Sequence, residues 1–247
     1  MVREAGERDR ARVLAVDTCT TTCSVGVING RRGRVGLVFE SKETHTRHLM
    51  TLVDQALAAV DLAIDKIELL AVTRGPGSFT GLRIGISTVM GLRAVTKAPA
   101  AGVSSLEVLA RQGVGVVPWV VPMIDARRDE VYFSLFQTTE AGVVPVTKEQ
   151  VGAPTQVTLP DERPALFIGN GADAYRSQIS LHYGRQAHFA PSISNTIHPL
   201  TVAECAQQRH AQNAHGPYED LTPIYLRKSD AEINRRAAGD LVGPNQA

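Results

Sequence analysis

The chain has 247 residues, enough for one large domain or two small ones with a sizeable buried core. Its 43% hydrophobic and 21% charged residues are typical of a folded globular protein. A formal net charge of +1 is far below that of most dedicated nucleic-acid binders and argues against strong RNA binding by this chain alone. Short basic groups do occur, and solvated surface is the simplest interpretation of each: Arg31, Arg32 and Arg34; Arg127 and Arg128; Arg227 and Lys228; Arg235 and Arg236.

The cysteine content and the N-terminal sequence indicate in which cellular compartment the protein lies. Three cysteines (Cys19, Cys23 and Cys205) make no disulfide framework and favour small buried thiols in a reducing environment. We expect residues 1–11 to be a mobile leader, because this charged stretch has no apolar segment of the kind found in signal peptides. No apolar run approaches the ~20 residues of a membrane span. These features predict a cytoplasmic protein without membrane contact.

The first half of the chain predicts the order β-β-β-α-β-α-β-α. Apolar residues from Leu49 to Val60 recur at helical spacing, and Ser104 and Glu107 have the spacing of a capping box. We expect strands at 13–17, 23–28, 34–40, 69–73 and 100–103, and helices at about 49–60, 79–95 and 104–112.

A similar order restarts after a glycine-valine linker near 113–117. We expect strands at 119–125, 130–136 and 142–151, a strand ending in a glycine turn at 165–171, and helices at 172–182 and 199–211. Both halves therefore begin with a strand that ends in aspartate, Asp17 or Asp125, followed by a tight turn and a returning strand. This repetition predicts an α/β architecture of two facing ribonuclease-H-like lobes, at 12–112 and 113–228. The second lobe is shortened, and a tail follows at 229–247.

The paired aspartates suggest a nucleotide cleft of the actin and sugar-kinase type. Ionised oxygens are the ligands that Mg²⁺ prefers, and a glycine turn in the second lobe would lie against an adenosine. The alternative is that both aspartates cap turns, and the first turn, DTCTTTC, has no glycine to wrap a phosphate closely. The candidate nucleotide-binding residues are Asp17, Thr18, Arg74, Arg83, Asp125, Gly169 and Gly171.

The stretch AVTRGPGSFTGLRIGIS, residues 71–87, is neither a P-loop nor a dinucleotide-binding motif. Gly81, Gly85 and Thr88 share one face of the helix that it opens. An interior glycine costs ~1 kcal/mol relative to alanine, so we expect another backbone to approach this face closely. The neighbour is either the helix carrying Leu49 and Leu52 or a helix of another chain.

The histidines do not form a recognisable metal motif. His45 and His48 are spaced i and i+3, without a third ligand nearby and without a His-Glu-x-x-His pattern. A hydrogen-bonding role at a helix start is the simpler interpretation, and a metallopeptidase is the weakest alternative.

Six segments stand out in chain order: LAVDTCTTTCSVGV, HTRHLMTLVDQAL, RGPGSFTGLRIGIS, GVSSLEVLA, IDARRDEVY and PIYLR. Together they resemble the TsaB (YeaZ-like) family of bacterial tRNA threonylcarbamoyladenosine biosynthesis proteins. The resemblance implies the actin/Hsp70/sugar-kinase fold of two lobes. It also implies a role in placing threonylcarbamoyl on the adenosine next to the anticodon of tRNAs.

The resemblance further implies that this subunit is not the catalyst. It would bind and activate a catalytic paralogue, TsaD, with a small ATPase, TsaE, completing the complex. It would meet tRNA only through that complex, form a homodimer in some states, and border ATP or ADP with Mg²⁺ at the partner interface. The implied subunit contacts are His45, Leu49, Leu52, Val53, Ala56, Gly81, Ile84, Gly85 and Thr88. The competing hypothesis is an independent actin-fold ATPase or small-molecule kinase that uses an Asp17/Asp125 cleft.

Overall fold

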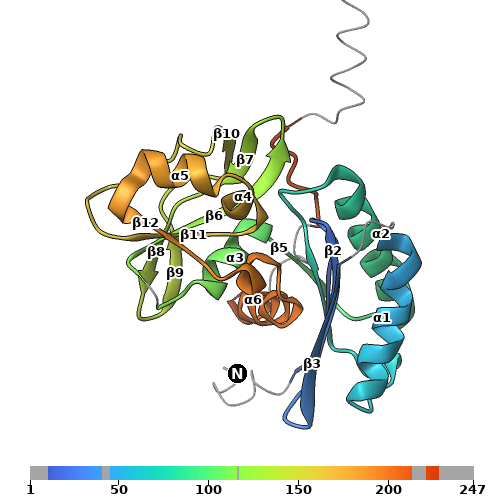
Figure 1. Ribbon diagram of the computed structural model, residues 1–247. Coiled ribbons are helices and arrows are strands. Elements are labelled where there is room, and N and C mark those ends of the chain that lie inside the picture. The colour runs from blue at the N-terminus through green and yellow to red at the C-terminus, as the bar shows by residue number, and fades with distance from the viewer. Residues whose placement is uncertain (1–10, 41–44, 116, 213–220, 228–247) are drawn as a thin grey trace, which may run out of the picture.

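The structure is a computed structural model that describes residues 11–40, 45–115, 117–212 and 221–227. Two sheets lie side by side, each accompanied by helices (Figure 1). The first contains β1 (Arg12–Asp17), β2 (Thr22–Asn29), β3 (Gly33–Glu40), β4 (Leu69–Thr73) and β5 (Ala100–Val103), in the order β3-β2-β1-β4-β5. Strand β2 is antiparallel to both of its neighbours, β1 and β3, whereas β4 and β5 run parallel to β1.

Both faces of the first sheet are covered, which explains its continuously apolar central strands. Helices α1 (His45–Ala59) and α2 (Phe79–Thr96) pack on one face, and α6 (Pro199–Gln212) packs on the other (Figure 1). Side chains alternate accordingly along β1: Leu14 and Val16 join the core under α1 and α2, while Val13 and Ala15 join the core under α6.

The second sheet repeats the first in direction and order. Its path is β10 (Gln150–Gly152), β7 (Glu130–Phe133), β6 (Trp119–Arg127), β11 (Ala165–Ile168) and β12 (Ala187–Phe189). Strand β7 is antiparallel to β6 and β10, whereas β11 runs parallel to β6 and β12. The prediction of two ribonuclease-H-like lobes is confirmed. The second is also shortened, because β7 and β10 have 4 and 3 residues where β2 and β3 have 8 each.

Strand β8 (Phe136–Thr139) pairs with β6 and, with its hairpin partner β9 (Gly142–Pro145), extends the second sheet. The other elements of the described residues are the helices α3 (Ser105–Gln112), α4 (Asn170–Ala174) and α5 (Arg176–Tyr183) and the 3₁₀ turns η2 (Ile64–Lys66), η3 (Gly184–Gln186) and η4 (Ser192–Asn195). The predicted capping box of α3 is half confirmed, since the Ser104 hydroxyl accepts a hydrogen bond from the Glu107 backbone N–H.

Three predictions for the second lobe are wrong. The single strand expected at 130–136 is divided, because β7 ends at Phe133 and β8 begins at Phe136, and each pairs separately with β6. The strand expected at 142–151 is two strands: β9 pairs with β8, and β10 pairs with β7. Pro145, which has no N–H to donate, ends β9, and the next backbone N–H, of Val146, bonds to the Leu135 carbonyl instead. The helix expected at 172–182 breaks at Tyr175 into α4 and α5. Strand β12 was not predicted.

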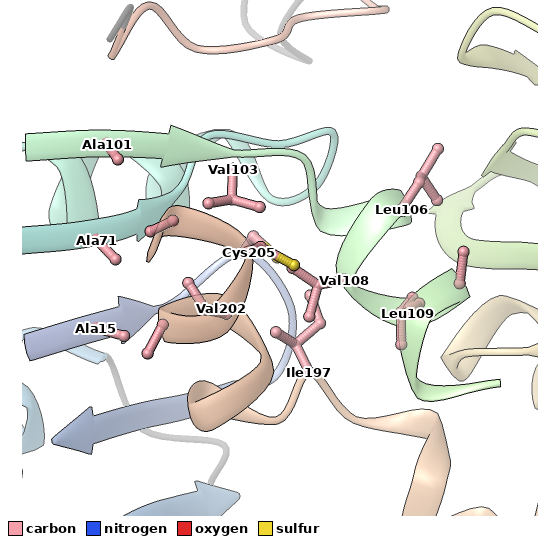
Figure 2. Close-up of a cluster of buried hydrophobic side chains, with 14 of the residues drawn as sticks. Ala15, Ala71, Ala101, Val103, Leu106, Val108, Leu109, Ile197, Val202 and Cys205 are labelled. Atoms are coloured by element: carbon pink, nitrogen blue, oxygen red, sulfur yellow. The ribbon is translucent and has the colours of Figure 1, made fainter. Parts of the chain in front are cut away.

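Helix α6 joins the lobes through the packing shown in Figure 2. Ala15, Ala71 and Ala101 lie opposite one another on β1, β4 and β5, and their small side chains let α6 approach the sheet. Val202 and Cys205 of α6 cover this stripe, and the same cluster continues into α3 and the second sheet. The division at residues 112 and 113 stays a prediction. It separates the two sheets, but α6, which it assigns to the second lobe, packs on the first sheet.

Candidate functional site

Asp17 ends β1 inside the protein. It is fully buried, and its carboxylate accepts hydrogen bonds from the Thr73 hydroxyl at 2.5 Å and from the Cys19 backbone N–H at 3.2 Å. Burial and the negative charge of Asp17 raise the pKa of the Cys19 thiol well above its usual range. The carboxylate therefore caps the turn after β1, as the alternative interpretation predicted.

The start of α2 covers this first turn. The Ser78 backbone N–H donates to the Cys19 carbonyl at 2.7 Å, and the Thr18 hydroxyl donates to the Gly81 carbonyl at 2.7 Å. A Cβ atom on Gly81 would lie 1.9 Å from the Thr18 carbonyl oxygen, and one on Gly85 would lie 2.5 Å from the Thr18 hydroxyl. The close neighbour of the glycine face is thus the first turn of the same lobe, rather than either of the helices we expected.

The turn after β6 is built differently. Asp125 is partly exposed, and its carboxylate accepts from the Arg127 backbone N–H at 2.7 Å and from the Tyr175 hydroxyl at 3.5 Å. Three successive residues, Arg127, Arg128 and Asp129, have left-handed φ angles of 61°, 56° and 59°. Such backbone costs about 1–3 kcal/mol for each non-glycine residue, so the surrounding contacts must hold it.

The glycines of the second lobe are already packed against their own sheet. A Cβ on Gly169 would lie 2.2 Å from the Met123 carbonyl oxygen, and one on Gly171 would lie 2.9 Å from the Asp125 backbone nitrogen. Gly169 also has a φ of 111°, and its N–H donates to the Asn195 side chain at 2.8 Å. These glycines permit the close approach of α4 to β6, and a nucleotide-binding role for Gly169 and Gly171 stays a prediction.

Residues 221–227, which we name the strap, engage both predicted arginines. The Ile224 backbone N–H donates to the Arg74 carbonyl at 2.7 Å, and the Arg74 guanidinium donates to the Thr222 carbonyl at 3.3 Å. The Arg83 Nε donates to the Tyr225 hydroxyl at 3.3 Å. A nucleotide-binding role for Arg74 and Arg83 stays a prediction.

A cluster of charged side chains lies where α3 and α6 meet the second lobe. The Glu107 carboxylate accepts hydrogen bonds from Arg111 at 3.0 Å and from Arg209, and the Arg209 guanidinium also donates to the Gly102 carbonyl at 3.1 Å. The Ser104 hydroxyl donates to Glu149 of the second lobe. Burial is the main cause that raises the pKa of Glu149.

The predicted subunit-interface residues divide by exposure. Leu49, Val53, Ala56, Gly81 and Gly85 are buried within the first lobe, so a partner could not touch them directly. Leu52, Ile84 and Thr88 are partly exposed, and the side chain of His45 lies outside the described residues.

Apolar side chains that the sequence analysis did not select are exposed on β3, α1 and α2. Four of them, with exposed fractions between 38% and 72%, lie on elements of the side of the first sheet that carries α1 and α2, and we name them the outer apolar surface: Phe39, Met50, Met90 and Val95. Val38, next to Phe39 on β3, points to the opposite face of the sheet. Figure 1 shows α1 and α2 next to each other on the same side of the first sheet. Met50 and Met90 each follow a buried residue, Leu49 or Val89, and so lie about 100° around the helix from it, beside the buried stripe.

Across 11–40, 45–115, 117–212 and 221–227, no three His, Cys, Asp or Glu residues gather in a way that could hold a metal ion. Within the same residues, no helix combines the length and the apolar character that crossing a membrane requires.

Comparisons with known proteins agree with one another. The family model described as TsaD, tRNA N6-adenosine threonylcarbamoyltransferase, matches residues 39–235. The Escherichia coli tRNA threonylcarbamoyladenosine biosynthesis protein TsaB is 40% identical over 232 residues, covering 89% of this chain and 96% of that protein. The Bacillus subtilis protein of the same name is 28% identical, with the same coverage. The structure of YeaZ from Pseudomonas aeruginosa superposes with a TM-score of 0.71 at 28% identity, covering 87% of this chain and all of that one.

Proposed function

The chain belongs to the TsaB family of tRNA threonylcarbamoyladenosine biosynthesis proteins, and we propose that it acts in that pathway as a non-catalytic partner subunit. In this role it binds and activates a TsaD-type threonylcarbamoyltransferase. The product is threonylcarbamoyl on the adenosine next to the anticodon, and the chain meets tRNA in the cytoplasm as part of the complex.

The observation that carries this proposal is the covered turn after β1. An actin-like ATPase would hold a metal-bound phosphate against such a turn. Here the Asp17 carboxylate is fully buried and accepts two hydrogen bonds from its own lobe. The Thr18 hydroxyl donates to α2, and that helix lies directly on the turn. A phosphate would have to displace α2 to reach Asp17, which favours a binding role over catalysis by this chain.

The outer apolar surface is the proposed contact with the transferase. Exposed apolar side chains grouped on neighbouring elements mark protein interfaces, and the flexible side chains of Met50 and Met90 suit a surface that binds more than one partner. The TsaD family model itself matches this chain, so a TsaD-type partner shares the lobe architecture. Pairing between related lobes then brings like helices together, and the same surface serves a homodimer when the partner is absent.

Reconstitution tests the function. Unmodified tRNA, threonine, bicarbonate, ATP, the adenylate-forming enzyme, the TsaD-type partner and the TsaE-type ATPase are combined with and without this chain, and threonylcarbamoyladenosine is quantified. We expect product only when the chain is present. Equal product without it contradicts the proposal. Omission of the ATPase or of Mg²⁺ in parallel reactions tests the predicted nucleotide requirement of the assembled complex.

A charge placed on the outer apolar surface tests the contact. We expect Met90→Asp to weaken binding of the TsaD-type partner roughly a hundredfold, because an aspartate would be buried in an apolar interface. Leu181→Asp is the matched control, since Leu181 is 89% exposed on α5 of the second lobe. Calorimetric titration measures binding, and thermal melts establish that both variants fold. Equal affinity of the two variants would place the interface elsewhere.

The competing ATPase hypothesis makes an opposite prediction. Purified chain would turn over ATP by itself, and Asp17→Asn and Asp125→Asn would each abolish that turnover. We expect no turnover above that of a mock-purified sample.

A further inference from the structure

The strap, residues 221–227, follows a path that its sequence did not predict. It crosses from the turn after β4 in the first lobe to the turn after β6 in the second, and Figure 1 shows it between α2 and β7. Two of the residues that it engages, Arg74 and Arg83, are among those predicted to bind a nucleotide. At its other end the strap contacts Ala126, which directly follows Asp125, another residue predicted to bind a nucleotide.

The first-lobe end of the strap is fitted closely. The Ile224 backbone N–H donates to the Arg74 carbonyl at 2.7 Å, and a Cβ on Gly75 would lie 2.9 Å from the Ile224 carbonyl oxygen. Gly75 therefore gives the strap room that a larger residue would remove. The Tyr225 ring stacks on Phe79 at 4.8 Å between centroids, and its hydroxyl accepts from Arg83.

The second-lobe end depends on Arg227. Its side chain is 16% exposed, and its Nη1 donates to the Ala126 carbonyl at 3.0 Å and to the Glu130 carboxylate at 3.1 Å. These two acceptors flank the three left-handed residues of the turn. Charge-assisted hydrogen bonds are stronger than neutral ones, so Arg227 holds both the strap and this costly backbone in place.

We propose that the strap is a built-in clasp between the lobes. In an ATPase of this fold a bound nucleotide bridges the two lobes, and here the chain's own residues make that bridge. The lobes share an apolar core around α6 and α3, and the clasp couples the two turns at another edge of their interface. The arrangement of the turns is then fixed without a ligand. This inference goes beyond the proposed function, because it needs neither the transferase nor tRNA.

Hydrogen exchange of the full chain tests the coupling across the lobes. Tyr225→Phe removes the hydroxyl that contacts the first lobe and retains the ring. We expect roughly tenfold faster exchange at 126–130 in the second lobe, because a loosened strap no longer holds Arg227 in position. Arg227→Ala should in turn speed exchange of the Ile224 amide. Arg227→Lys, which can still donate to both acceptors, should restore much of the protection, and Arg185→Ala on the exposed surface of the second lobe should change neither region.

The outcomes separate a clasp from two independent contacts. Faster exchange confined to the lobe whose contact was removed overturns the proposal, and so does no change in either lobe. Slow exchange of the β4 amides in every variant shows that the fold is intact. Saturating ATP with Mg²⁺ should leave the exchange of the wild-type turns unchanged. If ATP slows exchange at both turns, a nucleotide makes this bridge and the strap does not replace it.

Discussion

Replacing Gly81 by alanine tests the fit between α2 and the turn after β1. In most helices this change is favourable, because alanine has the higher helix propensity. At Gly81 the new Cβ would lie 1.9 Å from the Thr18 carbonyl oxygen, whereas ordinary van der Waals contact begins near 3.4 Å. The backbone of the turn or of the helix must therefore move by more than an ångström.

The magnitude follows from the contacts that this movement breaks. Overpacking a closely packed site costs about 1–3 kcal/mol. Separation of α2 from the turn also weakens two hydrogen bonds, from the Thr18 hydroxyl to Gly81 and from the Ser78 N–H to Cys19, each worth about 1 kcal/mol. The gain in helix propensity offsets at most about 1 kcal/mol. We expect the free energy of unfolding to fall by about 2–4 kcal/mol.

Gly91 provides a matched control in the same helix. It is exposed, and a Cβ there would meet nothing within 4 Å, so Gly91→Ala should stabilise the chain by about 0.5–1 kcal/mol. Urea unfolding followed by far-ultraviolet circular dichroism measures both variants. Fluorescence of Trp119, the single tryptophan, which is buried in the second lobe, reports whether that lobe unfolds separately. If Gly81→Ala is as stable as Gly91→Ala, the packing of α2 on the turn is not as tight as described.

Three further predictions concern individual side chains. Glu149→Gln should raise the urea midpoint of unfolding at neutral pH, because burial raises the pKa of Glu149 and the ionised carboxylate therefore disfavours folding. This gain in stability should vanish as the pH falls below about 4, where the carboxyl is protonated in the unfolded chain as well, since its ordinary pKa is 4.5. Asp125→Ala should lower the free energy of unfolding by about 1 kcal/mol by removing the acceptor for the Arg127 N–H, and Asp125→Asn should retain most of it; equal losses would argue against the cap. All three cysteines are buried, and burial raises the pKa of each thiol: well above its usual range for Cys19, to about 11 for Cys23 and to about 12 for Cys205. We therefore expect no thiol to react with an alkylating reagent in the native chain at mildly alkaline pH, and all three to react in denaturant.

The first lobe was predicted nearly completely from its sequence, because local signals agree with one another there. Apolar strands, the amphipathic α1 and the Ser78 and Ser104 caps each specify an element through neighbouring residues. In the second lobe the strands are short and their pairing is decided by distant partners. Periodicity therefore did not separate β9 from β10, and it gave no signal for β12, which adds to β11 at the edge of the sheet.

The candidate site shows the same division. The resemblance of six segments indicated the family. Residue types and spacing predicted the two aspartate turns and the close approach of another backbone to α2 at Gly81 and Gly85. Only the tertiary structure decided what approaches it, because Thr18 lies 63 residues away in sequence from the carbonyl that its hydroxyl contacts. The PIYLR segment of the strap stood out in the sequence, but its contacts could not be predicted, since Arg227 and its acceptor Ala126 are 101 residues apart. A short-range pattern records which face of an element must be buried, whereas the partner that buries it is chosen by long-range packing of the whole chain.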